Sequence, residues 1–208
     1  MRPPAAVIFD WCNTLVRDSE LDYEIAEKVL ERVGRSDIDI SSVDPGRVVK
    51  YLEYALGSRW QDAVTLYREF AEQSAKVRKL VPSDNALELL ELLYDNKISM
   101  GIVSNKNGEL LRKEVQTIGW SKYFSAVIGS GDTPENKPSP KPVIAALEIL
   151  DIETPCEQVL FIGDSISDVT SAQRAKCCPI VYGSIKTEGV LSFENFADLS
   201  VFVRGLLN

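Results

Sequence analysis

The chain opens with a short, unbroken run of apolar residues. Ala5 to Phe9 carries no polar side chain, and the run ends at a single carboxylate, Asp10. A run without alternation of polar and apolar positions is typical of a strand that is buried on both faces. We therefore expect a parallel strand here, with Asp10 at its carboxyl end, where open α/β sheets place their ligands. Asp10 could equally start a turn or cap a helix, and this stretch alone does not separate the interpretations.

The next part of the chain has apolar residues at helical spacing and no strand pattern. Helices are predicted over residues 18–34, 48–56 and 60–80, with a polar loop at 35–46. Gly34 fits the end of the first helix, and Gly57-Ser58 should break the second. We read this block as an all-helical insertion after the first strand.

Strands and helices alternate regularly beyond Val81-Pro82. Ser83 is predicted to cap a helix that runs to about Asn96. Further strands are expected at 98–103, 126–128, 159–162 and 179–182, and helices at 107–118, 140–150, 166–175 and 199–207. This alternation predicts an α/β fold, a parallel sheet with helices on both faces. The predicted domains are a core of residues 1–16 and 82–208 and a helical insertion of residues 17–81.

Composition narrows the classes of partner. Of the 208 residues 45% are hydrophobic, and the formal net charge of −8 argues against binding to nucleic acid or an anionic membrane. No apolar stretch approaches the roughly 20 residues that span a bilayer, and the N-terminus does not resemble a signal peptide. The cysteines show neither a disulfide framework nor zinc spacing, so we expect a cytoplasmic protein; they are Cys12, Cys156, Cys177 and Cys178.

The chain contains no histidine. This removes Ser-His and Cys-His nucleophile pairs, histidine-ligated zinc and imidazole acid–base chemistry. Any catalysis must use carboxylates, lysines, hydroxyls, thiols or a metal that is held by oxygen.

Polar residues follow three separate apolar strands. They are Asp10, then Ser104-Asn105, then the segment from Gly163 to Asp168. Because parallel strands emerge on the same side, these groups can converge. The carboxylates of Asp10, Asp164 and Asp168 would then lie in one cleft. They repel one another unless a cation binds them or their pKa values rise. Oxygen ligands without histidine or cysteine suit Mg²⁺, although Asp164 and Asp168 could instead cap a helix.

Lys137 opens a proline-stiffened stretch, Lys137-Pro138-Ser139-Pro140-Lys141-Pro142. A lysine held in this way could pair with Asp10 and with an anionic substrate. A lone loop lysine is ordinarily just solvated, so its interpretation depends on the other motifs.

Together these motifs resemble those of the haloacid dehalogenase-like hydrolase superfamily, over about residues 5 to 182. That family shows Asp-x-Asp-Gly-Thr-Leu after a strand, a strand that ends in Ser or Thr, a lysine often before Pro-x-Pro, and Gly-Asp-Ser-x-x-Asp. The corresponding segments here are Asp10-Trp11-Cys12-Asn13-Thr14-Leu15, Ser104, Lys137-Pro138-Ser139-Pro140 and Gly163 to Asp168. The helical block resembles the family's cap, and Ser104-Asn105-Lys106 with the cap length resembles the phosphoglycolate phosphatase branch.

The resemblance implies a Rossmann-like core with a helical cap and a Mg²⁺-dependent phosphatase that acts on a small phosphorylated metabolite. Asp10 would be the nucleophile and form an aspartyl-phosphate. Ser104, Asn105 and Lys137 would hold the phosphoryl group. The implied metal ligands are Asp10, Asp164, Asp168 and the backbone carbonyl of Cys12.

The sequence departs from the family at two positions. Cys12 stands where phosphatases of this family carry the acid–base aspartate, and a thiol with a reference pKa near 8.5 is a poor replacement. Losing acid–base help typically costs about 10²–10⁴-fold, so Cys12 would weaken or abolish turnover. Asn13 replaces the usual glycine, which is tolerable because asparagine also accepts left-handed backbone angles.

Other functions of this family stay open. Dehalogenases usually carry Tyr at the position of Cys12 and need no metal, against which Asp164 and Asp168 speak. Phosphonatases resemble the chain in their Asp-Trp and use a cap lysine, for which the candidates are Lys28, Lys50, Lys76 and Lys79. A third alternative is a phospho-ligand-binding protein without turnover. Substrate-reading cap residues are not identifiable; Arg47, Lys50 and Arg59 are guesses, and Trp60 and Tyr67 fit the cap core better.

Overall fold

The computed structural model describes residues 3–17, 19–43, 48–77, 80–153 and 158–207. The chain divides into two compact units, one formed by Met1–Val16 with Pro82–Asn208 and the other by Arg17–Val81. Five residues singled out in the sequence are not fully covered: Arg47, Lys79 and Cys156 lie outside the described residues, and so do the side chains of Lys50 and Lys76. In the part of the chain that is described, no helix is both long and apolar enough to cross a membrane.

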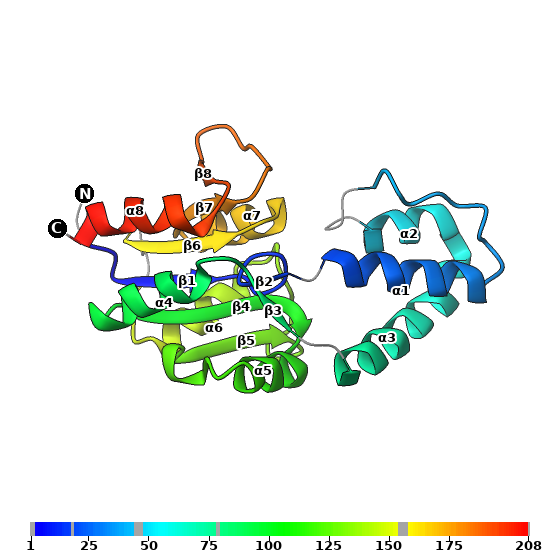
Figure 1. Cartoon of the computed structure of the whole chain (residues 1–208), viewed down its shortest axis with the longest axis horizontal. Coiled ribbons are helices and arrows are strands. Elements are labelled where there is room, and N and C mark those ends of the chain that lie inside the picture. The colour runs from blue at the N-terminus through cyan, green and yellow to red at the C-terminus, as the bar shows by residue number, and fades with distance from the viewer. Residues whose placement is uncertain (1–2, 18, 44–47, 78–79, 154–157, 208) are drawn as a thin grey trace. The chain divides into compact units, whose positions relative to one another are not determined.

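The larger unit is built on a six-stranded parallel sheet, as the alternating pattern predicted (Figure 1). Its strand order is β5-β4-β1-β6-β7-β8. The strands are β1 (Ala6–Phe9), β4 (Ser99–Asn107), β5 (Ala126–Ser130), β6 (Val159–Gly163), β7 (Cys178–Tyr182) and β8 (Leu191–Phe193). The chain builds outward from β1 to β4 and β5, then returns to add β6 on the other side of β1. The carboxyl ends of β1 and β6 therefore meet where the order reverses, which is the usual ligand site of such sheets.

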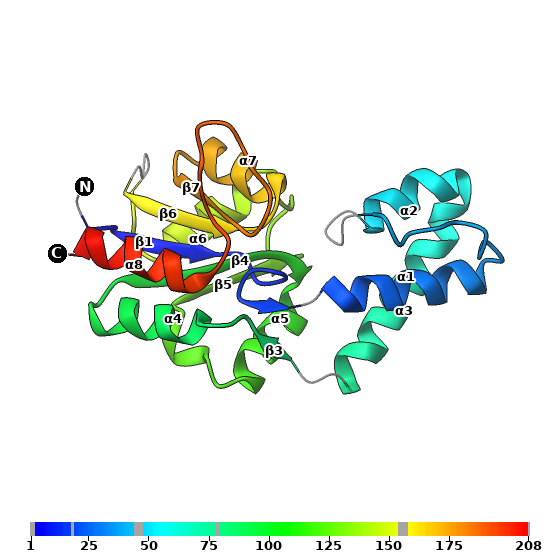
Figure 2. The same cartoon turned by 45° about the horizontal axis from the view of Figure 1, so that its top comes forward.

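Two apolar layers sandwich this sheet. Successive residues of β1 point to opposite faces, so Val7 and Phe9 join one core cluster, while Ala6 and Ile8 join the other. The first face is covered by α4 (Ala86–Asp95), α5 (Gly108–Thr117) and α8 (Phe196–Leu207), and the second by α6 (Lys141–Ile149) and α7 (Ile166–Arg174). Figure 2 shows α8 and α4 on one side of β1 and α6 on the other. All four residues of β1 are fully buried, as the unbroken apolar run predicted.

Three local predictions were wrong or incomplete. Ser83 does not cap α4; Asn85 precedes the helix with φ of 60° and no capping side chain, while the Ser83 hydroxyl donates to the Thr14 carbonyl oxygen over 2.6 Å. The two-residue strands β2 (Val16–Arg17) and β3 (Val81–Pro82) pair with each other and were not predicted. The edge strand β8 of the larger sheet was not predicted either. The strand β4 runs beyond Val103, with an irregular register up to Asn107.

The smaller unit has its own apolar core. Its helices are α1 (Ser19–Arg32), α2 (Val48–Leu56), a 3₁₀ turn at Gly57–Arg59 and α3 (Trp60–Val77). The buried set is Ile25, Ala26, Val29, Leu30, Ile40, Val48, Leu52, Leu56 and Ala63. Trp60 and Tyr67 pack against this cluster, in agreement with the core interpretation, and the Arg59 guanidinium donates to the Val33 carbonyl oxygen.

Candidate active site

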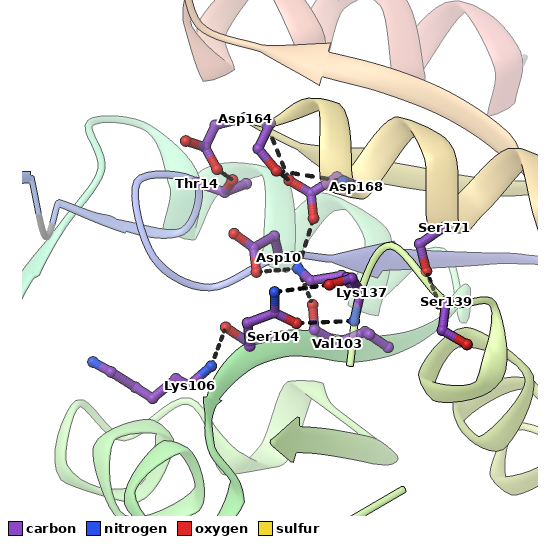
Figure 3. Close-up of polar contacts among 12 residues, drawn as sticks. Asp10, Thr14, Val103, Ser104, Lys106, Lys137, Ser139, Asp164, Asp168 and Ser171 are labelled. Carbon is purple, nitrogen blue, oxygen red and sulfur yellow. Dashed lines mark hydrogen bonds and ion pairs between the residues drawn. The ribbon is translucent and has the colours of Figure 1, made fainter. Parts of the chain in front are cut away.

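The predicted convergence of the strand ends is present at the carboxyl edge of the sheet. Asp10 follows β1 directly, while Asp164 and Asp168 follow β6 (Figure 3). One carboxylate oxygen from each of the three residues lies within 4.8 Å of the others. Asp10 and Asp168 are buried, with 6% and 2% of their surface exposed.

Lys137 lies at the centre of this cluster. Its Nζ donates to Asp10 Oδ1 and to Asp168 Oδ1, each over 2.6 Å, and to the Val103 carbonyl oxygen over 2.8 Å. An ammonium has three hydrogens, so these three acceptors use its full donor capacity. The fixed lysine that the proline-rich stretch suggested is therefore present, with a side chain only 3% exposed.

The loop that carries Lys137 is anchored from two sides. The Asn105 side chain accepts from the Lys137 backbone N–H over 3.0 Å and donates to the Lys137 carbonyl oxygen over 3.1 Å. From α7, the Ser171 hydroxyl donates to the Ser139 carbonyl oxygen over 2.6 Å. Asn105 was predicted as a phosphoryl ligand; in the structure its amide fixes the position of Lys137.

Asp168 shows the helix-capping role that the sequence left open, and it also contacts Lys137. It is the third residue of α7 in a capping box, where Oδ2 accepts from the Ser165 N–H and hydroxyl while the Asp168 N–H donates to Ser165 Oγ. Its other oxygen binds Lys137. This arrangement needs Gly163, because a Cβ on that residue would lie 2.5 Å from Asp168 Cβ.

Asp164 is held more loosely. The Thr14 hydroxyl donates to its Oδ1 over 3.4 Å, near the upper limit for a hydrogen bond. Thr14 comes from the turn after β1, where Asn13 has φ of 57°. This value confirms that Asn13 takes the left-handed conformation expected at that position.

The pKa values reflect a buried cluster with too little positive charge. Burial raises the pKa of Asp10; the Lys137 charge opposes this rise, and the Asp168 charge adds to it. Burial alone would lower the pKa of Lys137, but the two carboxylates outweigh it and hold that pKa above its ordinary value. Burial, followed by the charges of Asp10 and Asp168, raises the pKa of Asp164 to about 8. Three carboxylates against one ammonium leave a net charge of −2 when all are ionised.

This cluster fits a hard divalent cation. All side-chain donors are carboxylate oxygens, the ligand type that Mg²⁺ prefers. Hydrogen bonds from side chains use both oxygens of Asp168 but only Oδ1 of Asp10 and of Asp164. The residues best placed to hold a cation are therefore Asp10 and Asp164, with Asp168 fixing Lys137 beside them.

A second buried polar network lies next to the first and was not anticipated. The Trp11 indole N–H donates to Glu114 Oε2 over 2.7 Å, and Lys106 Nζ lies 2.7 Å from Glu114 Oε1. The Lys106 backbone N–H donates to Ser104 Oγ over 3.4 Å, and Ser104 is itself buried. The network joins the segment after β1 to the segment after Ser104. No sequence signal marked Glu114, which falls on a helix among other charged residues.

Cys12, the residue at the acid–base position, is half-buried and packs against the core cluster that contains Phe9 and Trp11. Of the other described cysteines, Cys177 is buried and Cys178 is half-buried.

Comparison with known proteins agrees with the motifs. A family model described as haloacid dehalogenase-like hydrolase matches residues 7–181. The phosphoglycolate phosphatase of Aquifex aeolicus is 31% identical over 188 residues, which cover 86% of each chain. A crystal structure of a haloacid dehalogenase-superfamily hydrolase from Ehrlichia chaffeensis is 46% identical, covers 100% of both chains and superposes with a TM-score of 0.75. One from Geobacter sulfurreducens, at 20% identity, shares the fold with a TM-score of 0.69 over 97% of this chain and 98% of its own. The chain therefore belongs to the haloacid dehalogenase-like hydrolases.

Proposed function

We propose that the chain is a Mg²⁺-dependent phosphatase that transfers the phosphoryl group of a small phosphorylated metabolite to Asp10 and then to water. The observation that carries this proposal is the position of Asp10. It is a buried carboxylate at the end of the central strand, 2.6 Å from a fixed ammonium and beside two further carboxylates. A nucleophile, a fixed positive charge and a cation site in one place are the parts that phosphoryl transfer requires.

Each side chain has a defined part in this reaction. An Asp10 oxygen attacks phosphorus, and the resulting aspartyl-phosphate is then hydrolysed by water. Lys137 offsets the negative charge of the phosphoryl oxygens, and its anchored position means that little reorganisation is needed. Ser104 is proposed to bind a phosphoryl oxygen, and Asn105 to position Lys137 and to line the same site.

Asp10, Asp164 and the backbone carbonyl of Cys12 are the proposed Mg²⁺ ligands, with Asp168 as a further candidate. When bound, Mg²⁺ would neutralise charge on the phosphoryl oxygens and the excess negative charge of the carboxylates. The unit of residues 17–81 is proposed to act as a cap that excludes water and selects the substrate.

Phosphoglycolate is the first substrate to test, because the Aquifex aeolicus relative carries the name of that phosphatase. The alternatives have weaker support. For a phosphonatase, Lys28 is an exposed residue of α1 with nothing to mark it as a Schiff-base lysine. A metal-independent dehalogenase leaves Asp164 without a use, and a non-catalytic binder would hold phosphate and Mg²⁺ without turnover.

The test is Mg²⁺-dependent phosphate release from a panel with phosphoglycolate, p-nitrophenyl phosphate and acetyl phosphate. Asp10→Asn should abolish release and Asp164→Asn should reduce it strongly. Asp95→Asn is the matched control, because Asp95 is an exposed carboxylate at the end of α4, just before β4 begins. Release that survives Asp10→Asn would refute the nucleophile, and binding of phosphate without release would favour the non-catalytic alternative.

A further inference from the structure

How readily the leaving group departs depends on whether the site can protonate it. When an Asp10 oxygen bonds to phosphorus, the bond from phosphorus to the leaving oxygen breaks, and that oxygen takes the electron pair. An alkoxide is too basic to depart readily unless it is protonated, whereas a carboxylate, a phosphate or a nitrophenolate departs as a stable anion. The proton donors near Asp10 therefore decide which phosphates react quickly.

Lys137 is the nearest charged donor, and it is committed elsewhere. Its three acceptors are Asp10, Asp168 and the Val103 carbonyl oxygen, at 2.6, 2.6 and 2.8 Å. An ammonium in this position stabilises charge but retains its proton.

The neighbouring carboxylates are no better suited. Both oxygens of Asp168 accept hydrogen bonds, from Lys137 on one side and from the Ser165 N–H and hydroxyl on the other. Asp164 is one of the proposed Mg²⁺ ligands, and a carboxylate that binds a metal has no proton to give. The Thr14 hydroxyl donates toward Asp164 and is a very weak acid.

The two residues after Asp10 complete the surroundings. The Trp11 indole N–H donates to Glu114 Oε2, and Trp11 is fully buried. Cys12 stands at the position of the family's acid, but it is a half-buried thiol packed against the apolar core. The full sequence contains no histidine that could substitute. The described contacts of Asp10 thus place a nucleophile and a charge stabiliser beside it but no efficient general acid.

We infer that this site acts on phosphates whose leaving group departs unprotonated, namely acyl phosphates and phosphoanhydrides, and that alkyl phosphates, phosphoglycolate among them, are slow substrates. The inference rests on the proposed function. In the first step the P–O bond to an acyl or phosphate leaving group breaks as the Asp10 O–P bond forms, and the leaving group departs as an anion. In the second step water adds to phosphorus, the Asp10 carboxylate is released, and the water proton passes to inorganic phosphate or to solvent.

The experiment measures kcat/KM, which reports transfer to Asp10 even where hydrolysis of the aspartyl-phosphate limits kcat. Substrates of matched size are substituted phenyl phosphates and benzyl phosphate, with acetyl phosphate as the acyl case. In the native chain we expect kcat/KM to fall by about 10²-fold or more from p-nitrophenyl to benzyl phosphate, the size of a missing general acid. A similar kcat/KM for the two substrates would overturn the inference, because some group, including one of the helical unit, would then supply the proton.

Substitutions at residue 12 sharpen the test. Cys12→Asp should raise kcat/KM for benzyl phosphate by about 10²-fold and flatten the dependence on the leaving group. Cys12→Asn is the control of equal size without the proton, and it should keep the steep dependence. A flat profile in both variants, or a steep one in folded Cys12→Asp, would contradict the assignment. If Cys12→Asp does not fold, the native profile decides alone. Equal inactivity of the native chain and Asp10→Asn on every substrate would refute the proposed function instead.

Discussion

The two sides of the carboxylate cluster differ sharply in how they are held. On the Lys137 side, Asp10 and Asp168 accept hydrogen bonds of 2.6 Å, and the lysine's loop is anchored by Asn105 and Ser171. On the Asp164 side, among the residues that the structure describes, the carboxylate accepts a single side-chain hydrogen bond, from Thr14 over 3.4 Å. Burial, followed by the negative charges of Asp10 and Asp168, raises the pKa of Asp164 to about 8. The Lys137 side thus has a positive charge that the protein itself supplies, whereas the Asp164 side has too little positive charge.

The strongest way to break this contrast is to remove the ammonium. Lys137→Met leaves Asp10 and Asp168 buried without their partner, which should lower the free energy of unfolding by about 3–5 kcal/mol and abolish activity. Denaturant unfolding without Mg²⁺ measures the change. Lys141→Met is the matched control, because Lys141 pairs with Glu135 at the surface and should change the free energy of unfolding far less. Equal effects would show that the buried pairs do not stabilise the fold.

A smaller change reaches the same side through its backbone. In Gly163→Ala the new Cβ would lie 2.5 Å from Asp168 Cβ and Cγ, so Asp168 must move away from Lys137. We expect a loss of about 1–3 kcal/mol in unfolding free energy together with reduced activity. Gly205→Ala should have the opposite sign, because its Cβ meets nothing within 4 Å in α8 and alanine favours helices by about 0.5–1 kcal/mol. Thermal unfolding of both variants tests the pair.

The contrast can be extended to Glu114, whose carboxylate joins Trp11 to Lys106. Glu114→Gln still accepts from the Trp11 indole but turns an amide toward the Lys106 ammonium, so we expect a loss of about 1–3 kcal/mol. If the network positions the segments around Ser104, kcat should also fall more than KM rises. Glu109→Gln is the control on the exposed face of α5. A stability loss with unchanged kinetics would limit Glu114 to a structural role.

The mildest probe is pH, and it acts on the loose side. Because the pKa of Asp164 is about 8 in the folded protein and near 3.8 when exposed, the folded state holds a proton between these values that the unfolded state has lost. The unfolding free energy of the metal-free protein should therefore decrease as pH rises toward about 8, by at most about 1.4 kcal/mol per unit. Mg²⁺ must displace the same proton, so its apparent affinity should rise up to about tenfold per pH unit and level off above about 8. Titration of Mg²⁺ binding at several pH values measures the change in affinity. Asp164→Asn should remove the pH dependence of the unfolding free energy.

Strong, regular patterns were readable from the sequence. The apolar run before Asp10 predicted the central strand. The polar residues after the parallel strands predicted the edge of the sheet at which the carboxylates gather. Even the left-handed Asn13 followed from its residue type. These features depend on periodicity and local conformation, which a single sequence carries.

Features that depend on distant contacts were not readable. Ser83 looks like a helix cap by its position, but the Thr14 carbonyl oxygen, 69 residues away, is its acceptor. Glu114 reaches Trp11 across 103 residues, and nothing near it in the chain announces a buried charge. The strands β2 and β3 are two residues each and therefore too short for any alternation to appear.

The pairing of β2 with β3 has a consequence for how the helical unit is carried. The chain leaves the core at Val16–Arg17 and returns at Val81–Pro82, and these segments are hydrogen-bonded neighbours, about 5 Å apart as adjacent strands are. The more than sixty residues of the helical unit therefore begin and end at neighbouring points of the larger unit. An insertion of different length or architecture can therefore be placed at this junction without changing the register of the six strands. The larger unit could carry different insertions in this way.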